Sequence, residues 1–382
     1  MRSPQTVLET LRKHAQKAHY QYERLYRNLY NPQLYLLAYQ NLYANKGSTT
    51  AGADGATLSG MSLKRIESLI KKLRDRSYQP HPARRQYIPK KSGNGLRPLG
   101  IPAADDKLVQ EAVRMILESI YEPTFQSTSH GFRPGKSCHT ALSQIQKTFT
   151  GVSWFVEGDI KGCFDNIDHH ILVNILKRRI KDEAFIDLIW KLLRAGYLED
   201  WMKHQTYSGT PQGSGVSPLL ANIYMNELDL FMEKLRAQFG KGDKRRFSND
   251  YVNAIARKMR CSAAKVKKKY TRDRIFGIEY ETKHGIKRAE FYHNGFRKSA
   301  PSKLDMDTTP DYRYSIRPKE VIARFMTGYC ELCCKNELPV MIYQVKNLKS
   351  LSGNEPWEQF MLKKRRKTLI VCEDCYKTIT NS

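Results

Sequence analysis

Trp154-Phe-Val-Glu-Gly-Asp-Ile-Lys-Gly-Cys-Phe-Asp-Asn-Ile-Asp168 is the stretch around which the rest of the chain is organised. Its apolar start is typical of a strand, and a polar turn separates Asp159 from Phe164 and Asp165. A carboxylate at a strand end is a ligand that Mg²⁺ prefers, together with substrate phosphates. Alone, the pattern favours a strand that ends in solvent with Asp159 in an ordinary turn, and the neighbouring motifs change that interpretation.

The chain carries a large positive charge. Lys and Arg number 65 against 38 Asp and Glu, giving a net charge of +27 for 382 residues. Such a surplus repels itself in a compact state and indicates a polyanionic partner, by default nucleic acid. A membrane surface is the alternative, but no basic amphipathic anchor stands out and no apolar run approaches the roughly 20 residues that cross a bilayer. The N-terminus lacks the apolar region of a secretory signal, so we expect a protein that is not secreted.

Hydrophobic periodicity predicts both helices and hairpins. Helices are expected over residues 1–45 with a break at Pro32, over 62–76 and 105–122, as a pair over 169–196, and over 219–231. A basic hairpin is expected over residues 78–102 and a second hairpin over 197–209. The cations of the first hairpin either contact phosphate or are simply solvated.

Two glycine-rich segments next to predicted helices are suited to phosphate binding. Residues 129–140 combine glycines with Arg133 and Lys136 ahead of a helix, which makes an anion site unless the segment is an ordinary loop and cap. Residues 209–218 place glycines on both sides of Pro211-Gln212, and glycine allows a backbone to approach a ligand closely.

The order of these motifs resembles the reverse transcriptases encoded by group II introns. The resemblance runs from about residue 30 to 235, through YIPKKSGNGLRPLGIP, DDKLVQEAVRMILESIYEPTF, SHGFRPGKSCHTAL, WFVEGDIKGCFDNIDHHIL and YSGTPQGSGVSPLLANIYMNELD. It implies an α+β fold with the fingers and a truncated palm of a right-hand polymerase, and the activity of an RNA-directed DNA polymerase. It further implies that Asp159 would hold catalytic Mg²⁺, Phe164 would lie under the sugar, Arg133 would meet the triphosphate, and Gln212 would lie near the incoming nucleotide.

The chain departs from this family at the palm. The family carries two more metal-binding carboxylates on a Tyr-x-Asp-Asp hairpin, and no such motif occurs downstream of Gln212. The Asp105-Asp106 pair starts a predicted helix upstream of Asp159, where we expect a cap and a first-turn acid. Because two-metal phosphoryl transfer needs carboxylates that converge on both ions, the polymerase site is incomplete. We expect the end of the palm, the thumb and the start of the maturase domain to be missing between about 236 and 248.

A basic tract follows the apolar helix. Part of it, residues 248–270, resembles the later half of the family's maturase domain, which grips intron RNA, and we expect it to be helical. Aromatic residues among cations suit irregular or single-stranded RNA, although a disordered basic linker is the alternative. The expected RNA-binding cations are Arg257, Lys258, Lys265, Lys267, Lys268 and Lys269.

Two C-x-x-C pairs lie near the C-terminus, at Cys330 and Cys333 and at Cys372 and Cys375. Four thiolates at this spacing close a tetrahedral shell and predict a structural Zn²⁺.

The same region resembles the HNH endonuclease domain of these intron proteins, a small ββα zinc module. Where that family carries histidines, this chain has Tyr343, Gln344 and Tyr376, and its last histidine is His293. Neither tyrosine nor glutamine acts as a base at neutral pH, so we expect an inactive nuclease.

We therefore expect four parts: a helical extension (1–60), fingers and partial palm (61–235), a basic maturase-like segment (236–310) and a degenerate HNH-type zinc module (320–382). The first hypothesis is an RNA-binding protein that assists folding and splicing of structured intron RNA. The alternatives are an RNA-directed DNA polymerase serving a mobile intron, which would need Mg²⁺ and carboxylates from elsewhere, and an inactive relic. Whether the chain is an enzyme stays open, as do a DNA target and the oligomeric state. The expected location is a bacterial cytoplasm or the plastid or mitochondrion that encodes it.

Overall fold

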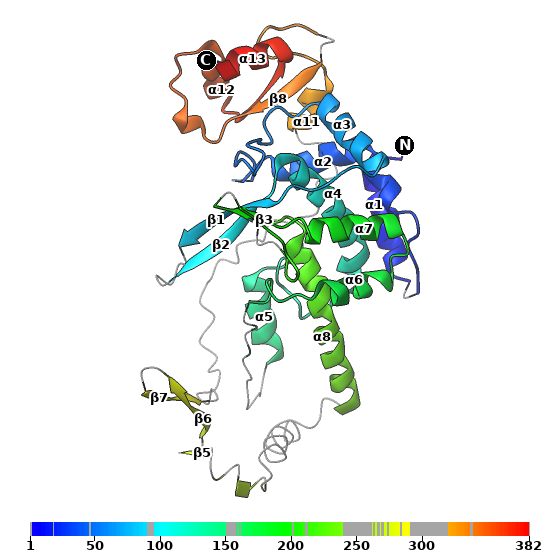
Figure 1. Ribbon diagram of the computed structural model, residues 1–382, viewed down its shortest axis with the longest axis vertical. Coiled ribbons are helices and arrows are strands. Elements are labelled where there is room, and N and C mark those ends of the chain that lie inside the picture. Colours follow the sequence, from blue (N-terminus) through cyan, green and yellow to red (C-terminus); the bar gives the residue numbers. More distant parts are fainter. Residues whose placement is uncertain are drawn as a thin grey trace. The chain divides into compact units, whose positions relative to one another are not determined.

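The computed structural model forms two compact units (Figure 1), which are described separately. The first comprises Met1–Phe125, Gly162–Met225 and Arg313–Ser382, and the second Gln126–Lys161 and Asn226–Tyr312. The structure describes residues 2–17, 19–45, 47–89, 95–149, 158, 160, 162–200, 202–210, 213–239, 262, 264–265, 268, 271–272, 275–282, 285–290, 320–336 and 339–381.

The first unit begins with three capped α-helices and one 3₁₀ helix. They are α1 (Pro4–Ala15), the 3₁₀ helix η1 (Tyr26–Tyr30), α2 (Pro32–Leu42) and α3 (Leu63–Arg74). Ser3, Asn31 and Ser62 each accept a hydrogen bond from a backbone N–H in the first turn of α1, α2 and α3. Pro32 occupies the first turn of α2, where its missing N–H leaves no helical hydrogen bond unmade. The expected break at Pro32 is therefore confirmed, as the start of a new helix.

Helix α4 (Ala104–Tyr121) lies in the core and packs against α1 and α2. It is buried on nearly every side, and Val113 and Ile116 are fully buried. It also buries charge: Arg114 donates to Glu111 at 2.7 Å and to Glu118 at 2.9 Å. Paired in this way, the three charges are tolerated in the interior, whereas a single one would be strongly destabilising.

The acids at the start of α4 do not cap it as expected. The N-cap residue is Ala103, which offers no side-chain acceptor. Asp105 instead accepts from Arg65 Nε at 2.7 Å, and the buried Asp106 accepts from the Tyr78 hydroxyl at 2.5 Å and the His81 backbone N–H at 2.8 Å. Both acids lie in the first turn as predicted. Their oxygens accept hydrogen bonds from Arg65, Tyr78 and His81 in the preceding segments and do not cap the helix.

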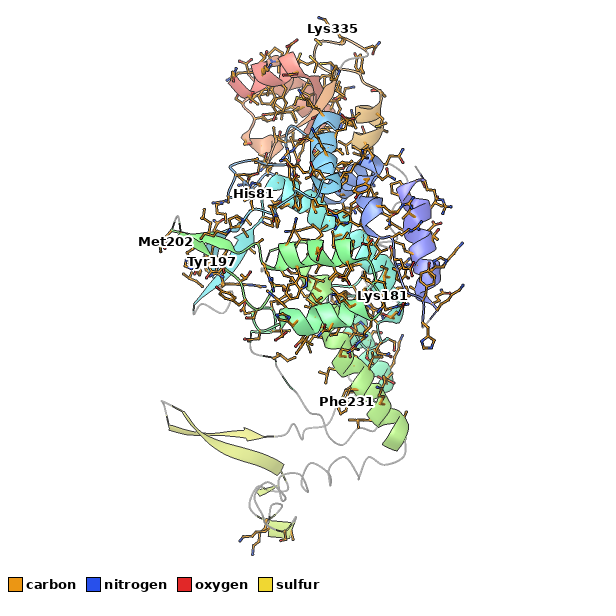
Figure 2. The ribbon with its side chains drawn as sticks, turned by 45° about the vertical axis from the view of Figure 1, so that its right-hand side comes forward. His81, Lys181, Tyr197, Met202, Phe231 and Lys335 are labelled. Carbon is orange, nitrogen blue, oxygen red and sulfur yellow. The ribbon has the colours of Figure 1, made fainter. Side chains whose placement is uncertain are left out.

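Two hairpins combine into one sheet of order β2-β1-β3-β4. Its strands are β1 (Ala83–Pro89), β2 (Leu96–Ile101), β3 (Tyr197–Glu199) and β4 (Met202–His204). Both expected hairpins are confirmed. Their union is a parallel pairing of Ala83 with Tyr197, which no local pattern predicted. Tyr197 and Met202 mark the second hairpin in Figure 2.

The remaining expected helices of this part of the chain are present. They are η2 (Glu122–Thr124), α6 (His169–Lys177), α7 (Glu183–Leu193) and α8 (Ser217–Phe239), the last longer than expected because the helix continues through polar residues after Phe231. Within the described residues no helix is both long and apolar enough to cross a membrane.

The second unit contains α5 (Cys138–Thr148) and strands β5 (Thr271–Arg272), β6 (Ile275–Thr282) and β7 (Gly285–Glu290). The expectation of a helical basic segment is wrong for residues 275–290, because β6 and β7 pair antiparallel from Gly277 with Glu290 to Thr282 with Gly285. Most of residues 248–270, the part singled out as helical, lies outside the described residues. Phe276, Ile278, Tyr280 and Thr282 recur at every second position. This alternation of aromatic and β-branched residues favours a strand over a helix.

The C-terminal residues form a small body that we call the cysteine module, residues 320–381. It contains α11 (Glu320–Met326), β8 (Val340–Gln344), η3 (Leu348–Ser350), α12 (Pro356–Lys364), β9 (Thr368–Cys372) and α13 (Glu373–Asn381). Strands β8 and β9 pair antiparallel from Val340 with Cys372 to Gln344 with Thr368. Met361, Leu369 and Ile379 belong to a core of its own.

The cysteine module is joined to the N-terminal helices by strand-like pairing. The Gly60 N–H donates to Ile342 O, and the Ile342 N–H donates to Met61 O, both at 2.9 Å. The buried side chain of Gln344 donates through Nε2 to Tyr43 O at 2.6 Å and to Ser48 Oγ at 2.9 Å. The module is therefore part of the first unit, with α11 against α2 (Figure 1).

We expect Glu118 to give the protein a pH-dependent stability. Burial raises its pKa from 4.5 to about 6, and the attraction of Arg114 only partly opposes this. Between those pH values the folded state holds a proton that the unfolded state releases, so the free energy of unfolding should fall as pH rises, by about 2 kcal/mol. Denaturant unfolding between pH 4 and 7 measures this, with Glu118→Gln as the control that should flatten the slope. An equal slope in both proteins would contradict the assignment.

Candidate nucleic-acid site and metal centre

Two segments that the sequence analysis singled out lie against each other. The Thr210 N–H donates to Phe164 O and the Gly209 N–H donates to Ile167 O, each at 2.7 Å. The buried His169 adds a contact of 2.6 Å between Nε2 and Gly209 O, and the Ser208 hydroxyl donates to Asp165 O at 3.2 Å. The turn that carries Phe164 and Asp165 is thus fixed to the segment that precedes Gln212.

Glycine is required at two positions of this arrangement. Gly209 has φ +81°, and a Cβ there would lie 2.8 Å from Phe164 O and Asp165 O. Gly213 has φ +108°, and its Cβ would lie 2.3 Å from Gly100 O. The group that each glycine approaches is the chain's own backbone, so the expected close approach to a ligand stays a prediction.

A cavity of about 350 Å³ opens beside these segments. Arg85, Asp165, Tyr197, Tyr207 and Thr210 are among the residues that line it. The Arg85 guanidinium lies 3.5 Å from the centre of the Tyr197 ring, and Tyr207 is 83% exposed. An arginine and an exposed ring suit a stacked base beside a phosphate, although Arg85 also pairs with Glu199 at 3.5 Å. The sequence pointed to Arg85 within a basic hairpin, but it gave no sign of the pairing with Tyr197.

The predicted polymerase residues are only partly described. Phe164 is half-buried against the main core. Asp159 and Gln212 lie outside the described residues, so their roles stay predictions.

Arg133 lies in the second unit. Its guanidinium donates to Gln126 O at 2.7 Å and to Ser129 O at 2.8 Å. Burial raises the pKa of Asp229 in the same unit, and the positive charge of Arg133 partly opposes this rise. The Ser137 side chain caps α5 in a capping box. The arrangement favours the ordinary loop and cap over a preformed anion site, because the donors of Arg133 already hold the loop.

The expected RNA-binding cations fall mostly outside the described residues, namely Arg257, Lys258, Lys267 and Lys269. Lys265 and Lys268 are described and both are exposed. Exposure is what phosphate contact needs, but no further geometry of this tract supports or contradicts the prediction.

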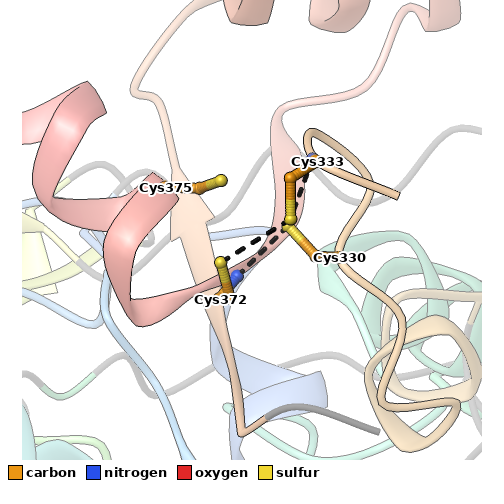
Figure 3. A group of neighbouring side chains, drawn as sticks. All are labelled: Cys330, Cys333, Cys372 and Cys375. Carbon is orange, nitrogen blue, oxygen red and sulfur yellow. Dashed lines mark hydrogen bonds between the residues drawn. The ribbon is translucent and has the colours of Figure 1, made fainter. Parts of the chain in front are cut away.

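The four predicted zinc ligands do come together (Figure 3). The sulfur atoms of Cys330, Cys333, Cys372 and Cys375 all lie within 4.8 Å of one another, and the Sγ atoms of Cys333 and Cys372 are 3.9 Å apart. A tetrahedral Zn²⁺ with bonds of about 2.3 Å separates its sulfur ligands by about 3.8 Å. The donor set and its spacing therefore fit a metal ion.

The electrostatics of this cluster also favour a cation. Burial raises the pKa of Cys330, but the backbone N–H groups of Cys333 and Cys372 point at its sulfur and lower the pKa to about 7. Burial and the neighbouring thiols raise the pKa of Cys375 strongly. Four thiols this close cannot all ionise unless a cation neutralises them. Cys334 is exposed and does not belong to the cluster.

The positions where the resemblance expects nuclease histidines are used for packing. The Tyr343 ring lies 5.3 Å from the Trp357 ring and 5.9 Å from the Tyr376 ring. The Tyr376 hydroxyl lies 3.4 Å from Ser59 Oγ, and Gln344 holds the module to Tyr43. None of these three side chains supplies a base. The contacts of Gln344 and Tyr376 with residues 43–60 had no signal in the sequence pattern.

Comparison with protein families gives two matches. The model described as "Reverse transcriptase (RNA-dependent DNA polymerase)" matches residues 88–243. The model described as "AI2M/AI1M-like, HNH endonuclease" matches residues 330–376, the part that contains all four clustered cysteines.

Comparison with curated proteins gives relatives from introns. The chain is 52% identical to the group II intron-encoded protein LtrA of Lactococcus lactis over 66% of this chain and 42% of that protein. It is 48% identical to an uncharacterized 91 kDa protein in a cob intron of Schizosaccharomyces pombe, over 61% of this chain and 28% of that protein. A more distant relative, 29% identical over 35% of this chain and 26% of its own length, is nuclear intron maturase 1, mitochondrial, of Arabidopsis thaliana. The chain thus spans less than half the length of these relatives.

We expect the cysteine cluster to bind one zinc ion that stabilises the module. Removing the metal by chelation, or Cys375→Ser, should lower the unfolding temperature by more than about 5 °C, because about 2–4 °C corresponds to 1 kcal/mol in domains of this size. Elemental analysis and thermal unfolding measure the two effects. Cys334→Ser is the matched control and should keep both the metal and the unfolding temperature. Full stability of the chelated protein would contradict the assignment.

Proposed function

Because this chain is a relative of the group II intron-encoded reverse transcriptase/maturase proteins, we propose that it binds structured intron RNA and assists its folding and splicing. The observation that carries the proposal is the net charge of +27 on a chain with a reverse-transcriptase match but no Tyr-x-Asp-Asp motif. The charge supplies phosphate binding, while the carboxylates that two-metal catalysis needs are missing from the sequence.

The proposal extends to details of the architecture. We take residues 61–235 as fingers with a shortened palm, and β8, β9 and α13 as the ββα zinc module. Zinc is the proposed metal because thiolates prefer it and the sulfur spacing suits it. The module would then serve as a scaffold, since its histidine positions hold Tyr343, Gln344 and Tyr376. The proposed location is a bacterial cytoplasm or an organelle that encodes the chain.

RNA-directed DNA polymerisation is the second candidate function. The hydrogen bond from the Thr210 N–H to Phe164 O favours this second function, because it holds the turn of the predicted nucleotide site in place. Mg²⁺ would then bind at Asp159, with further carboxylates supplied by another chain. A DNA target is a possible partner only for this function.

Binding of structured RNA tests the first function. The protein should bind a folded group II intron RNA more tightly than a random duplex of equal length at physiological salt. Each phosphate contact should contribute about 0.7–0.9 to the slope of log affinity against log salt. Filter binding across a salt series measures both quantities. Equal affinity for the two RNAs would contradict the proposal, whatever the slope.

Primer extension separates the two functions. We expect no extension on an RNA template with Mg²⁺, because Asp159 alone cannot hold two metal ions. If extension occurs, Asp159→Ala should abolish it, while Asp187→Ala, which removes an exposed carboxylate on α7, should not. Extension that depends on Asp159 would replace the first function by the second.

A further inference from the structure

A second, larger cavity lies where the cysteine module meets the N-terminal helices. Its volume is about 740 Å³. One wall comes from the segment after α2, including Asn45 and Thr49, and the other from the ends of β8 and β9. Of its lining residues, only Gln344 belongs to a motif that stood out in the sequence.

Acids neutralise the arginines of this cavity. Arg324 donates to both carboxylate oxygens of Glu331 at 2.8 Å and to Thr368 Oγ1 at 2.8 Å. Arg366 pairs with Glu320. Two cations are matched by two anions, so this network forms the wall and leaves no net charge.

Two lysines remain in the lining of the cavity. Lys346 lies two residues after the end of β8 and Lys367 directly precedes β9, and both are exposed. The Val345 N–H donates to Lys367 O at 3.0 Å, so Lys346 lies one residue beyond the partner of Lys367 in the hairpin. Among the residues that the structure describes, neither ammonium makes an ion pair. Both charges are therefore available to an anion in the cavity.

The floor of the cavity is rigid and polar. Gln344 is 8% exposed, and its two hydrogen bonds to Tyr43 and Ser48 tie β8 to the opposite wall. Asn347 and Ser350 add further polar groups beyond Lys346. The lysines are therefore presented from a fixed frame, which lowers the entropy cost of binding.

We propose that this cavity binds the phosphate backbone of a single-stranded nucleic acid through Lys346 and Lys367. Single strand is favoured over duplex because a cavity of this volume falls within the range of about 300–1,000 Å³ typical of small-ligand sites. A duplex would meet only the rim. The inference rests on the proposed RNA-binding function and names a site within it that lies outside both the polymerase-like residues and the basic tract.

The test uses paired double variants of the full chain. Lys346→Ala with Lys367→Ala should weaken binding of a ten-nucleotide RNA and reduce its salt slope by about 1.4, since each lost single-strand phosphate contact contributes about 0.7. The matched control, Lys363→Ala with Lys364→Ala, removes the same charge from exposed positions of α12 that do not line the cavity. It should leave the slope nearly unchanged.

Further arms identify the ligand and guard against misfolding. A DNA strand of the same sequence distinguishes RNA from single strands in general, and a duplex should show little difference between the variants. Both double variants should unfold at the temperature of the unmodified protein. Equal losses in the two variants, or none in either, would overturn the inference. If the unmodified protein does not bind structured RNA, the proposed function fails instead.

Discussion

The pairing of Met61 with Ile342 is the backbone contact through which the cysteine module depends on the N-terminal part of the first unit. Two backbone hydrogen bonds extend the β8-β9 hairpin by one short stretch from the N-terminal part of the chain. Around this contact Gln344 is buried, α11 packs against α2 and the larger cavity opens. Other residues of the module, Val321, Phe325, Val340 and Ile370, pack into the main core, while Met361, Leu369 and Ile379 belong to its own smaller core. The positions of the pairing are constrained as well, because Met61 and Ile342 are fully buried and Gly60 has φ +75°.

The contacts that hold the predicted nucleotide site and the cysteine module together do not depend on the groups that a reaction would need. Around Phe164 and Gly209 the contacts are between backbone groups, and they need glycine more than any acid. In the cysteine module the rings of Tyr343 and Tyr376 pack edge to face, while Gln344 donates to Tyr43 O in the segment after α2. Folding therefore requires the glycines, cysteines and apolar residues, whereas the carboxylates and histidines are needed only for reactions. A protein that only binds its partner can therefore keep the glycines, cysteines and apolar residues without the carboxylates and histidines.

Local patterns predicted the elements better than their associations. Most helices of the first unit, both hairpins and the four-cysteine cluster follow from short-range spacing, and the structure contains them. The bonds of Asp106 to Tyr78 and His81 were missed because they join segments that carry no mutual signal. The alternation in β6 was readable, but the expectation of a helix for the whole basic segment came from the preceding residues 248–270. Asp159 and Gln212 lie outside the described residues, so the centre of the predicted polymerase site stays a prediction.

The separation in sequence between the partners of the module contact bears on how the chain folds during synthesis. Gln344 reaches Tyr43 across 301 residues, so this part of the first unit cannot close until residues beyond 344 have left the ribosome. Contacts of such high contact order form slowly, and the strand-like stretch at Gly60 and Met61 stays without its partner meanwhile. The nascent chain therefore presents an open strand edge at residues 60–61 until most of its length has been made.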